Sequence, residues 1–136
     1  MPAAPLPDEL RRFLAAPRKA VVGTVRPDGA AVTTACWYDV DAEGRLVLSM
    51  DVDSHRLRHL RKNPRLGLTA LGDDWYSHVS VLARAVEFRR DEDLADIDAL
   101  AQRYEGAPYE DRSYTGMTVL AEIERWHTWG DPAAEA

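Results

Sequence analysis

The spacing of apolar residues changes in the first half of the chain. A helical spacing comes first, where Asp8 precedes Leu10, Phe13 and Leu14 and Pro17 ends the run. β-rich segments follow, and two clusters of turn residues join them, Pro27-Asp28-Gly29 and Asp41-Ala42-Glu43-Gly44. These patterns predict a short helix and then an antiparallel meander, with strands at 19–26, 30–39 and 45–50.

The second half of the chain again contains helical spacings and β-rich segments. Ser54 can cap a helix whose apolar face holds Leu57 and Leu60, and Pro64 ends it. Another helix opens at Asp91 with acidic residues in its first turn and ends at 104–106. Further strands are predicted at 65–71, 75–90 and 116–129. Six mostly antiparallel strands and three helices predict a mainly β (α+β) fold, in which a small barrel has peripheral helices filling its gaps.

Composition is that of an ordinary soluble globular protein, with 46% hydrophobic and 29% charged residues. The 136 residues fit a single domain over 1–136, whose Pro- and Ala-rich ends, 1–7 and 131–136, are expected to fray. No apolar run approaches the roughly 18 residues of a membrane helix, and the N-terminus has no secretory pattern. We therefore expect no membrane contact, and because the single cysteine, Cys36, can form no internal disulfide, we expect a cytoplasmic protein.

The densest charge run, from Asp53 to Arg65, stands out in an acidic chain. It holds five basic side chains and two histidines, whereas the formal net charge of the protein is −6. A solvated helix face is the simplest interpretation. However, no acidic residue lies between Ser54 and Arg65 to compensate the charge. The run also begins at a helix start directly after a strand, where free N–H groups favour an anion, so a phosphate site is the functional alternative.

Two other interpretations of this run have less support. A DNA-recognition helix would need a second helix packed before it, and strands flank this one, so we expect no nucleic-acid partner. His55 and His59 lie four apart on one helix face, but two ligands among so many cations do not make a metal site. We therefore expect no bound metal.

Several segments carry a family resemblance through their order and spacing. Ser54-His55-Arg56 precedes Leu60-Arg61-Lys62-Asn63-Pro64, and further segments are Gly23 to Ala31, Thr34 to Tyr38, Val81 to Ala85 and Glu124 to Trp129. Over residues 8–130 this arrangement resembles the pyridoxamine 5′-phosphate oxidase-like, split-barrel flavin-binding superfamily. It is most similar to the actinobacterial branch that uses the deazaflavin coenzyme F420.

The resemblance implies a six-stranded antiparallel split β-barrel that forms a homodimer with its cofactor at the subunit interface. The implied activity is an F420-dependent oxidoreductase acting on a small organic molecule, with an FMN-dependent one as the alternative. Arg56 would pair with the cofactor phosphate, helped by Ser49 and Ser54, and His55 takes the first position of the family's basic pair. Two groups complete the implied cofactor site: the ring contacts Thr33, Thr34, Ala35, Cys36 and Trp37, and the surplus cations Arg58, Arg61 and Lys62. Taken by itself, Cys36 is a small core residue rather than a nucleophile.

Candidate substrate contacts lie later in the chain. Trp75, Tyr76 and His78 open a long predicted strand, where they either pack at a subunit interface or contact a ring or substrate. Arg125 and His127 share a strand face and resemble the Arg-x-His pair that contacts substrate in related oxidases, although an exposed strand end also explains them. Trp129 is a further candidate. Three tyrosines near a Gly-Ala-Pro loop, Tyr104, Tyr109 and Tyr114, either cover a pocket or simply pack the loop.

Several residues of this sequence differ from the family pattern, and they leave a non-enzymatic function as an alternative. His55, Ala31 and Ala83 replace a cation, a proline and a glycine of the family, and two acids, Asp51 and Asp53, lie close to the expected phosphate. A non-enzymatic flavin- or haem-binding protein, or a cofactor-free split-barrel dimer, is therefore the alternative to an enzyme.

Overall fold

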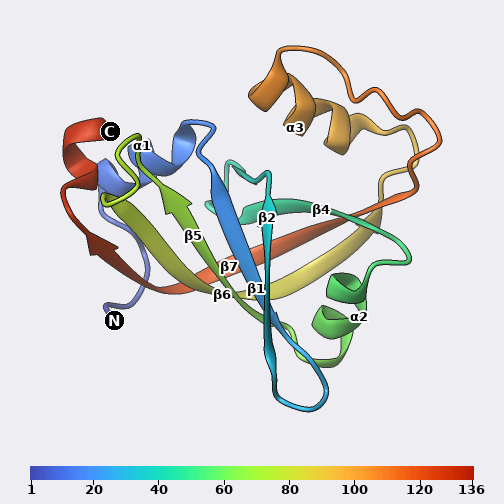
Figure 1. Ribbon diagram of the computed structural model, residues 1–136, viewed down its shortest axis with the longest axis horizontal. Coiled ribbons are helices and arrows are strands. Elements are labelled where there is room, and N and C mark those ends of the chain that lie inside the picture. The colour runs from blue at the N-terminus through green and yellow to red at the C-terminus, as the bar shows by residue number, and fades with distance from the viewer.

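Seven strands form one antiparallel sheet in the order β2-β1-β5-β6-β7-β4-β3, in a computed structural model that describes all 136 residues (Figure 1). The elements are α1 (Asp8–Ala15), β1 (Ala20–Val25), β2 (Ala31–Cys36), β3 (Asp39–Val40), β4 (Leu46–Asp51), α2 (His55–Lys62), β5 (Arg65–Leu71), β6 (His78–Arg90), α3 (Ala95–Glu105), β7 (Gly116–Trp129) and the 3₁₀ helix η1 (Pro132–Glu135). The mainly β fold with three peripheral α-helices is confirmed, with seven strands rather than six. No helix is both long and apolar enough to span a membrane.

The extra strand arises because the segment predicted at 30–39 divides in two. β2 and β3 lie at opposite edges of the sheet, so the chain crosses between the edges at Trp37 and Tyr38. Tyr38 is fully buried, and its hydroxyl donates to the carbonyls of Leu14 and Ala16 at 2.9 and 3.2 Å. Because these hydrogen bonds hold the Tyr38 side chain in the core, the predicted strand is interrupted at this residue.

Turn chemistry explains where the neighbouring strands begin and end. Gly29 and Gly44 have positive φ angles of 87° and 80° in the two predicted turns, a conformation that glycine adopts without steric cost. β6 begins at His78 rather than at Trp75, because Trp75 itself has a positive φ of 59° within the turn that Gly72 and Ser77 close.

One face of the sheet forms the core, and the opposite face is largely open. Alternation along β1, β5 and β6 buries Val22, Leu68 and Val81 inside a cluster of 22 buried apolar residues. The open face carries Val21 and Leu82, which are 36% and 46% exposed. Figure 1 shows α1 near η1, α2 to the right of the β1–β2 hairpin, and α3 set apart from the sheet.

Both chain ends, 1–7 and 131–136, make hydrogen bonds to the rest of the molecule in this structure. The N-terminal segment lies along β7, where Ala4 N–H donates to the Glu124 carbonyl at 3.0 Å. At the other end, the guanidinium of the buried Arg18 donates to the Glu135 carbonyl at 2.7 Å. A buried guanidinium needs such partners, and this need fixes the C-terminal turn.

Candidate functional site

The basic run folds as α2, with the start that the sequence predicts. Ser54 is the N-cap residue, and its hydroxyl accepts from the Leu57 N–H at 3.3 Å. Leu57 and Leu60 are buried and anchor the helix on the sheet. No acidic residue lies in the first turn of α2, and its N-terminus, the positive end of the helix dipole, lies beside β4 and directly after Asp53.

A groove of about 920 Å³ opens between α3 and the end of β2. Its lining residues include Ala35, Cys36, Trp37, Ser49 and Arg56 among the predicted ring and phosphate contacts, together with Lys19, Ala20, Val21, Asp51, Leu71, Ile97, Tyr104, Glu105, Tyr109 and Tyr114. We call this the α3 groove. It brings five of the twelve predicted cofactor residues to one place.

Aromatic side chains form one wall of the α3 groove. The Trp37 and Tyr104 rings stack with centroids 5.5 Å apart, and Tyr109 meets Trp37 edge-on at 6.1 Å. The Tyr114 hydroxyl lies 2.8 Å from the Ser49 Oγ. The three tyrosines therefore line the groove. Of the two interpretations that the sequence leaves open for them, covering a pocket and packing the loop, the position of the three side chains in the groove favours the first.

Two tethers hold α3 at the groove. The helix begins at Ala95 rather than at the predicted Asp91, and the Asp91 carboxylate instead accepts from the N–H groups of Asp96 and Ile97 at 3.0 and 2.9 Å. At the far end, Arg103 donates to the carbonyls of Tyr38 and Ala15 at 2.9 and 2.6 Å. Sequence reasoning did not find Arg103, since its partners lie more than 60 residues away.

The groove interior is apolar enough to change the acidity of the groups that line it. Burial raises the pKa of the Cys36 thiol to about 11, against a smaller opposing influence of the nearby Arg56 charge. Burial likewise raises the pKa of Tyr114, while its hydrogen bond with Ser49 acts in the opposite direction. Both groups are therefore neutral at physiological pH, and Arg56 is the charge that acts on the Cys36 thiol, while Lys19, Asp51 and Glu105 also line the groove.

A second pocket, of about 640 Å³, is lined mainly by basic residues, three of them arginine or lysine and two histidine. Its residues are Arg26, Pro27, Val32, His55, Arg58, His59 and Lys62, and we call it the basic pocket. Arg58 is held in place by the Asp53 carbonyl at 2.8 Å and by His55 Nδ1 at 2.9 Å. His59 is buried, with Nδ1 2.9 Å from the Thr24 hydroxyl.

β2 passes both the basic pocket and the α3 groove. Val32 lines the basic pocket and Cys36 lines the groove, and the alternation of β2 places Thr34 on the same face between them. The predicted contact Thr33 lies on the opposite, exposed face of β2. Arg61 reaches neither pocket, since its guanidinium lies 4.9 Å from the centre of the Phe88 ring.

Most of the predicted substrate residues also come together. A pocket of about 330 Å³ on the open face of the sheet is lined by Trp75, Tyr76, His78, His127 and Trp129, with Thr69 and Leu71. Leu71 also lines the α3 groove, so this aromatic pocket adjoins it. Arg125 is not among the lining residues, and its guanidinium instead reaches the Met1 carbonyl at 3.5 Å. No three His, Cys, Asp or Glu side chains are grouped as metal ligands.

The antiparallel sheet with α2 beside its open groove is the split β-barrel of flavin-binding oxidoreductases. The family described as pyridoxamine 5′-phosphate oxidase matches residues 6–130, and the chain belongs to this family. The family binds FMN and includes oxidoreductases. Among curated proteins, none matches the sequence.

Solved structures share this fold at low sequence identity. An F420 reductase aligns with a TM-score of 0.80 and 22% identity, over 90% of this chain and 98% of its own. A conserved hypothetical protein from Mycobacterium tuberculosis gives 0.71 and 24%, over 98% and 90% of the two chains. General Stress Protein 26 from Bacillus anthracis gives 0.64 and 16%, over 90% and 92%. At these identities the likeness concerns the fold.

Proposed function

We propose that this protein is an F420-dependent oxidoreductase that transfers a hydride between the deazaflavin and a small organic molecule. The observation that carries the proposal is the pairing of an apolar, aromatic groove with a separate cationic pocket along one strand, β2. A cofactor with a flat ring, a phosphate and a longer acidic tail matches both.

The α3 groove suits the ring and the first phosphate. Its volume of about 920 Å³ lies within the range of about 300–1,000 Å³ common for ligand sites. Trp37 and Ala35 offer flat or small surfaces to the ring, and Arg56 offers a charge-assisted contact to the phosphate. Ser49 adds a hydroxyl on the same side.

The basic pocket favours F420 over FMN. FMN ends at its phosphate, whereas the deazaflavin continues through a phosphodiester into a glutamate tail. Arg58, Lys62 and His55 line the basic pocket, and no carboxylate does. Arg26 is the one lining cation with an ion pair, to Asp28 at 3.1 Å. Such a site gains most from a ligand with several negative charges.

The cofactor supplies the hydride chemistry when bound, and the chain supplies orientation and exclusion of water. Trp37 and Tyr104, stacked on one another, shield one side of the groove from solvent. The substrate would enter from the aromatic pocket, where His78 and Trp129 lie beside the groove. We also propose that Arg56 fixes the ring position by holding the phosphate end.

A homodimer would complete the site. Val21, Leu82 and Trp129 share the open face of the sheet and are 36%, 46% and 65% exposed. Exposed apolar side chains on one face are typical of a protein interface. A second copy on this face would cover the aromatic pocket and the edge of the α3 groove, so both would lie between subunits.

Titration of the purified protein with F420 and with FMN tests the proposed function. We expect F420 to bind with a dissociation constant in the micromolar range and more tightly than FMN. Yellow protein with bound FMN would favour the FMN-dependent alternative that the family description supports. If neither cofactor binds below about 1 mM, a free energy of about −4 kcal/mol, the proposal is wrong.

A further inference from the structure

The cations of the basic pocket have few acidic partners. Arg26 pairs with Asp28, but Arg58 and Lys62 form no ion pair. The Arg58 guanidinium donates instead to a backbone carbonyl and to a histidine ring. Two full positive charges therefore lie at this pocket without a neutralising carboxylate.

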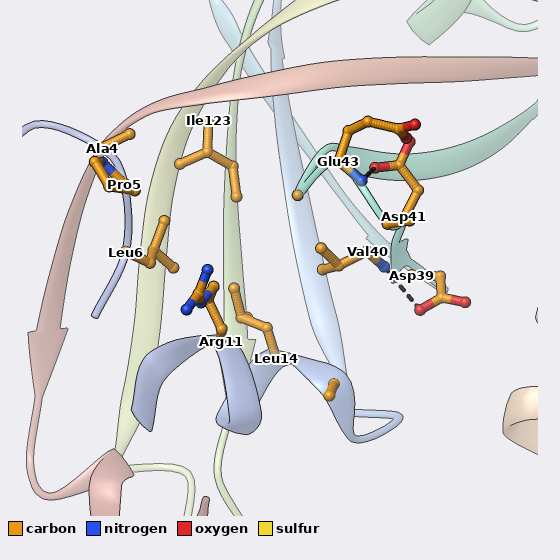
Figure 2. Close-up of a pocket in the computed structure, with 13 residues that line it drawn as sticks. Ala4, Pro5, Leu6, Arg11, Leu14, Asp39, Val40, Asp41, Glu43 and Ile123 are labelled. Carbon is orange, nitrogen blue, oxygen red and sulfur yellow. Dashed lines mark hydrogen bonds between the residues drawn. The ribbon is translucent and has the colours of Figure 1, made fainter. Parts of the chain in front are cut away.

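A pocket of about 470 Å³ beside α1 has the opposite arrangement (Figure 2). Every charged side chain that lines it already has a partner of opposite charge: Arg11 pairs with Asp8, Asp41 and Glu43 pair with Arg45, and Asp39 pairs with Arg103. Unpaired charge thus distinguishes the basic pocket from this one.

His59 is the buried member of the basic pocket. The residue is 8% exposed, and its Nδ1 lies 2.9 Å from the hydroxyl of Thr24, which is 1% exposed. The Thr24 hydroxyl has no other hydrogen-bond partner, and a buried hydroxyl is costly unless its proton is donated. It therefore donates to His59 Nδ1, which places the proton of the neutral imidazole on Nε2.

A different donor holds His55 in the same tautomer. His55 Nδ1 lies 2.9 Å from a terminal nitrogen of Arg58. Because a guanidinium has no acceptor, Arg58 donates to Nδ1, and the proton of the neutral His55 ring is also on Nε2. His55 and His59 lie four residues apart on α2 and both line the basic pocket. Both rings thus keep the same donor, Nε2–H, for a ligand.

The Nε2 atom of His59 is open to the pocket. Trp126 Nε1 is the one side-chain nitrogen or oxygen that is sealed from solvent without a hydrogen-bond partner. His59 Nε2 also has no partner in the protein, so it is reached through the pocket that its ring lines. The other polar side chains of the lining are arginine, lysine and His55, none of which has a free acceptor. A ligand of this pocket must therefore accept hydrogen bonds.

We propose that the basic pocket is an oxyanion site in which His59 and His55 donate through Nε2–H while Arg58 and Lys62 supply the charge. Its ligand is a chain that carries several carboxylates, because a volume of about 640 Å³ and donors from two segments suit an extended anion. The inference rests on the proposed function and deepens it, since it assigns named donors to the acidic tail of F420. It also adds His59, which is not among the cofactor residues predicted from the sequence.

Two measurements on the full-length protein test the site without F420. In protein labelled with ¹⁵N-histidine, the ring signals at about pH 7.5 should show the Nε2–H tautomer for His55 and His59. The binding probe is N-acetyl-triglutamate, and N-acetyl-triglutamine, which lacks the side-chain charges, is its matched control. We expect the probe to bind with a dissociation constant of about 1 mM or below and to shift the His59 Nε2 signal. The control should bind at least about tenfold more weakly.

Two variants of His59 separate donation from packing. The amide of His59→Gln can accept from Thr24 and donate into the pocket, so the probe should bind within about twofold of the wild-type affinity. His59→Leu lacks a donor and should bind the probe about tenfold more weakly. Circular dichroism should show that both variants are folded, and the ¹⁵N signals of the wild-type protein report the tautomer whatever their stability.

Three results would overturn the inference: a His59 proton on Nδ1 in the wild-type protein, a His59 signal that the probe leaves unmoved, or wild-type affinity in folded His59→Leu. Failure of F420 to bind, with the probe results as expected, would refute the proposed function and leave this anion site standing. F420 binding together with any of the three contrary results would refute the anion site alone.

Discussion

The guanidinium of Arg103 donates to the carbonyl of Tyr38 at 2.9 Å and so joins α3 to the point where the chain crosses between the sheet edges. The same group donates to the carbonyls of Leu14, Ala15 and Ala16 at 3.0, 2.6 and 2.8 Å, at the C-terminal end of α1. A cation is favourable at that end of a helix, where carbonyls lack partners. Arg103 thus holds together three segments that the sequence separates widely.

Replacing Arg103 should destabilise the protein measurably. Lysine keeps the charge but lacks the planar fork that reaches these carbonyls, so we expect both Arg103→Lys and Arg103→Ala to lose about 2 kcal/mol of unfolding free energy. Urea denaturation measures the loss. The exposed Arg12 of α1 provides the control, since Arg12→Ala should change stability by about 0.5 kcal/mol or less. Equal effects of the Arg103 and Arg12 variants would contradict the role of Arg103.

Cys36 should resist alkylation in the folded protein. Because burial raises its pKa from 9.0 to about 11, the folded state holds about a hundredfold less thiolate at pH 8 than an unburied thiol would. Iodoacetamide should therefore label the folded protein far more slowly than the urea-unfolded protein, and the rate should climb as the pH approaches 11. The favourable contribution of the neutral thiol to stability is present below pH 9 and is lost as the pH rises through 11. Equal labelling of both states at pH 8 would show that Cys36 is not buried in this way.

The basic pocket should distinguish the two cofactors. In the double variant Arg58→Ala, Lys62→Ala, we expect F420 to bind about tenfold more weakly and FMN to bind as before, because only the longer anion reaches these cations. The F420 affinity of the wild-type protein should also fall with added salt more steeply than that of the variant. A parallel loss for both cofactors would mean that the pocket acts on the phosphate alone.

Leu82→Glu should prevent dimer formation. The side chain is 46% exposed on the open face of the sheet, so a charge there leaves the folded monomer intact but is costly to bury in an interface. Sedimentation equilibrium should give a dimer for the wild-type protein and a 15.2 kDa monomer for the variant. Glu92, exposed outside this face, gives the control Glu92→Ala, which should stay dimeric. A monomeric wild-type protein would contradict the proposed interface.

Local patterns in the sequence were sufficient for much of the fold. Turn residues near Gly29 and Gly44, and the Ser54 cap with Leu57 and Leu60, depend on neighbours a few positions away, and the structure has them as predicted. The division of the strand at Tyr38 was not predictable in the same way. It depends on carbonyls of α1 more than 20 residues earlier, which no periodicity reveals.

In the candidate site, too, local sequence patterns predict some residues, whereas others depend on contacts with distant parts of the chain. Cys36, Trp37 and Arg56 were predicted from motif order and meet in the α3 groove. The sequence does not place Tyr104 in the site, because its position is set by hydrogen bonds with the backbone of Arg18 and Tyr38. Arg61 was assigned to the cofactor, yet Phe88 of β6 offers its ring to that guanidinium, a contact that depends on tertiary packing.

The affinity of F420 for wild-type protein and for Arg56→Ala tests the central claim most directly. Loss of a charge-assisted phosphate contact should cost about 1.5–3 kcal/mol, so the dissociation constant should rise about 10- to 150-fold, while Arg12→Ala should bind like wild type. Circular dichroism and the urea midpoint should confirm that Arg56→Ala remains folded. An affinity of folded Arg56→Ala equal to that of the wild-type protein would contradict the assignment of the α3 groove as the cofactor site.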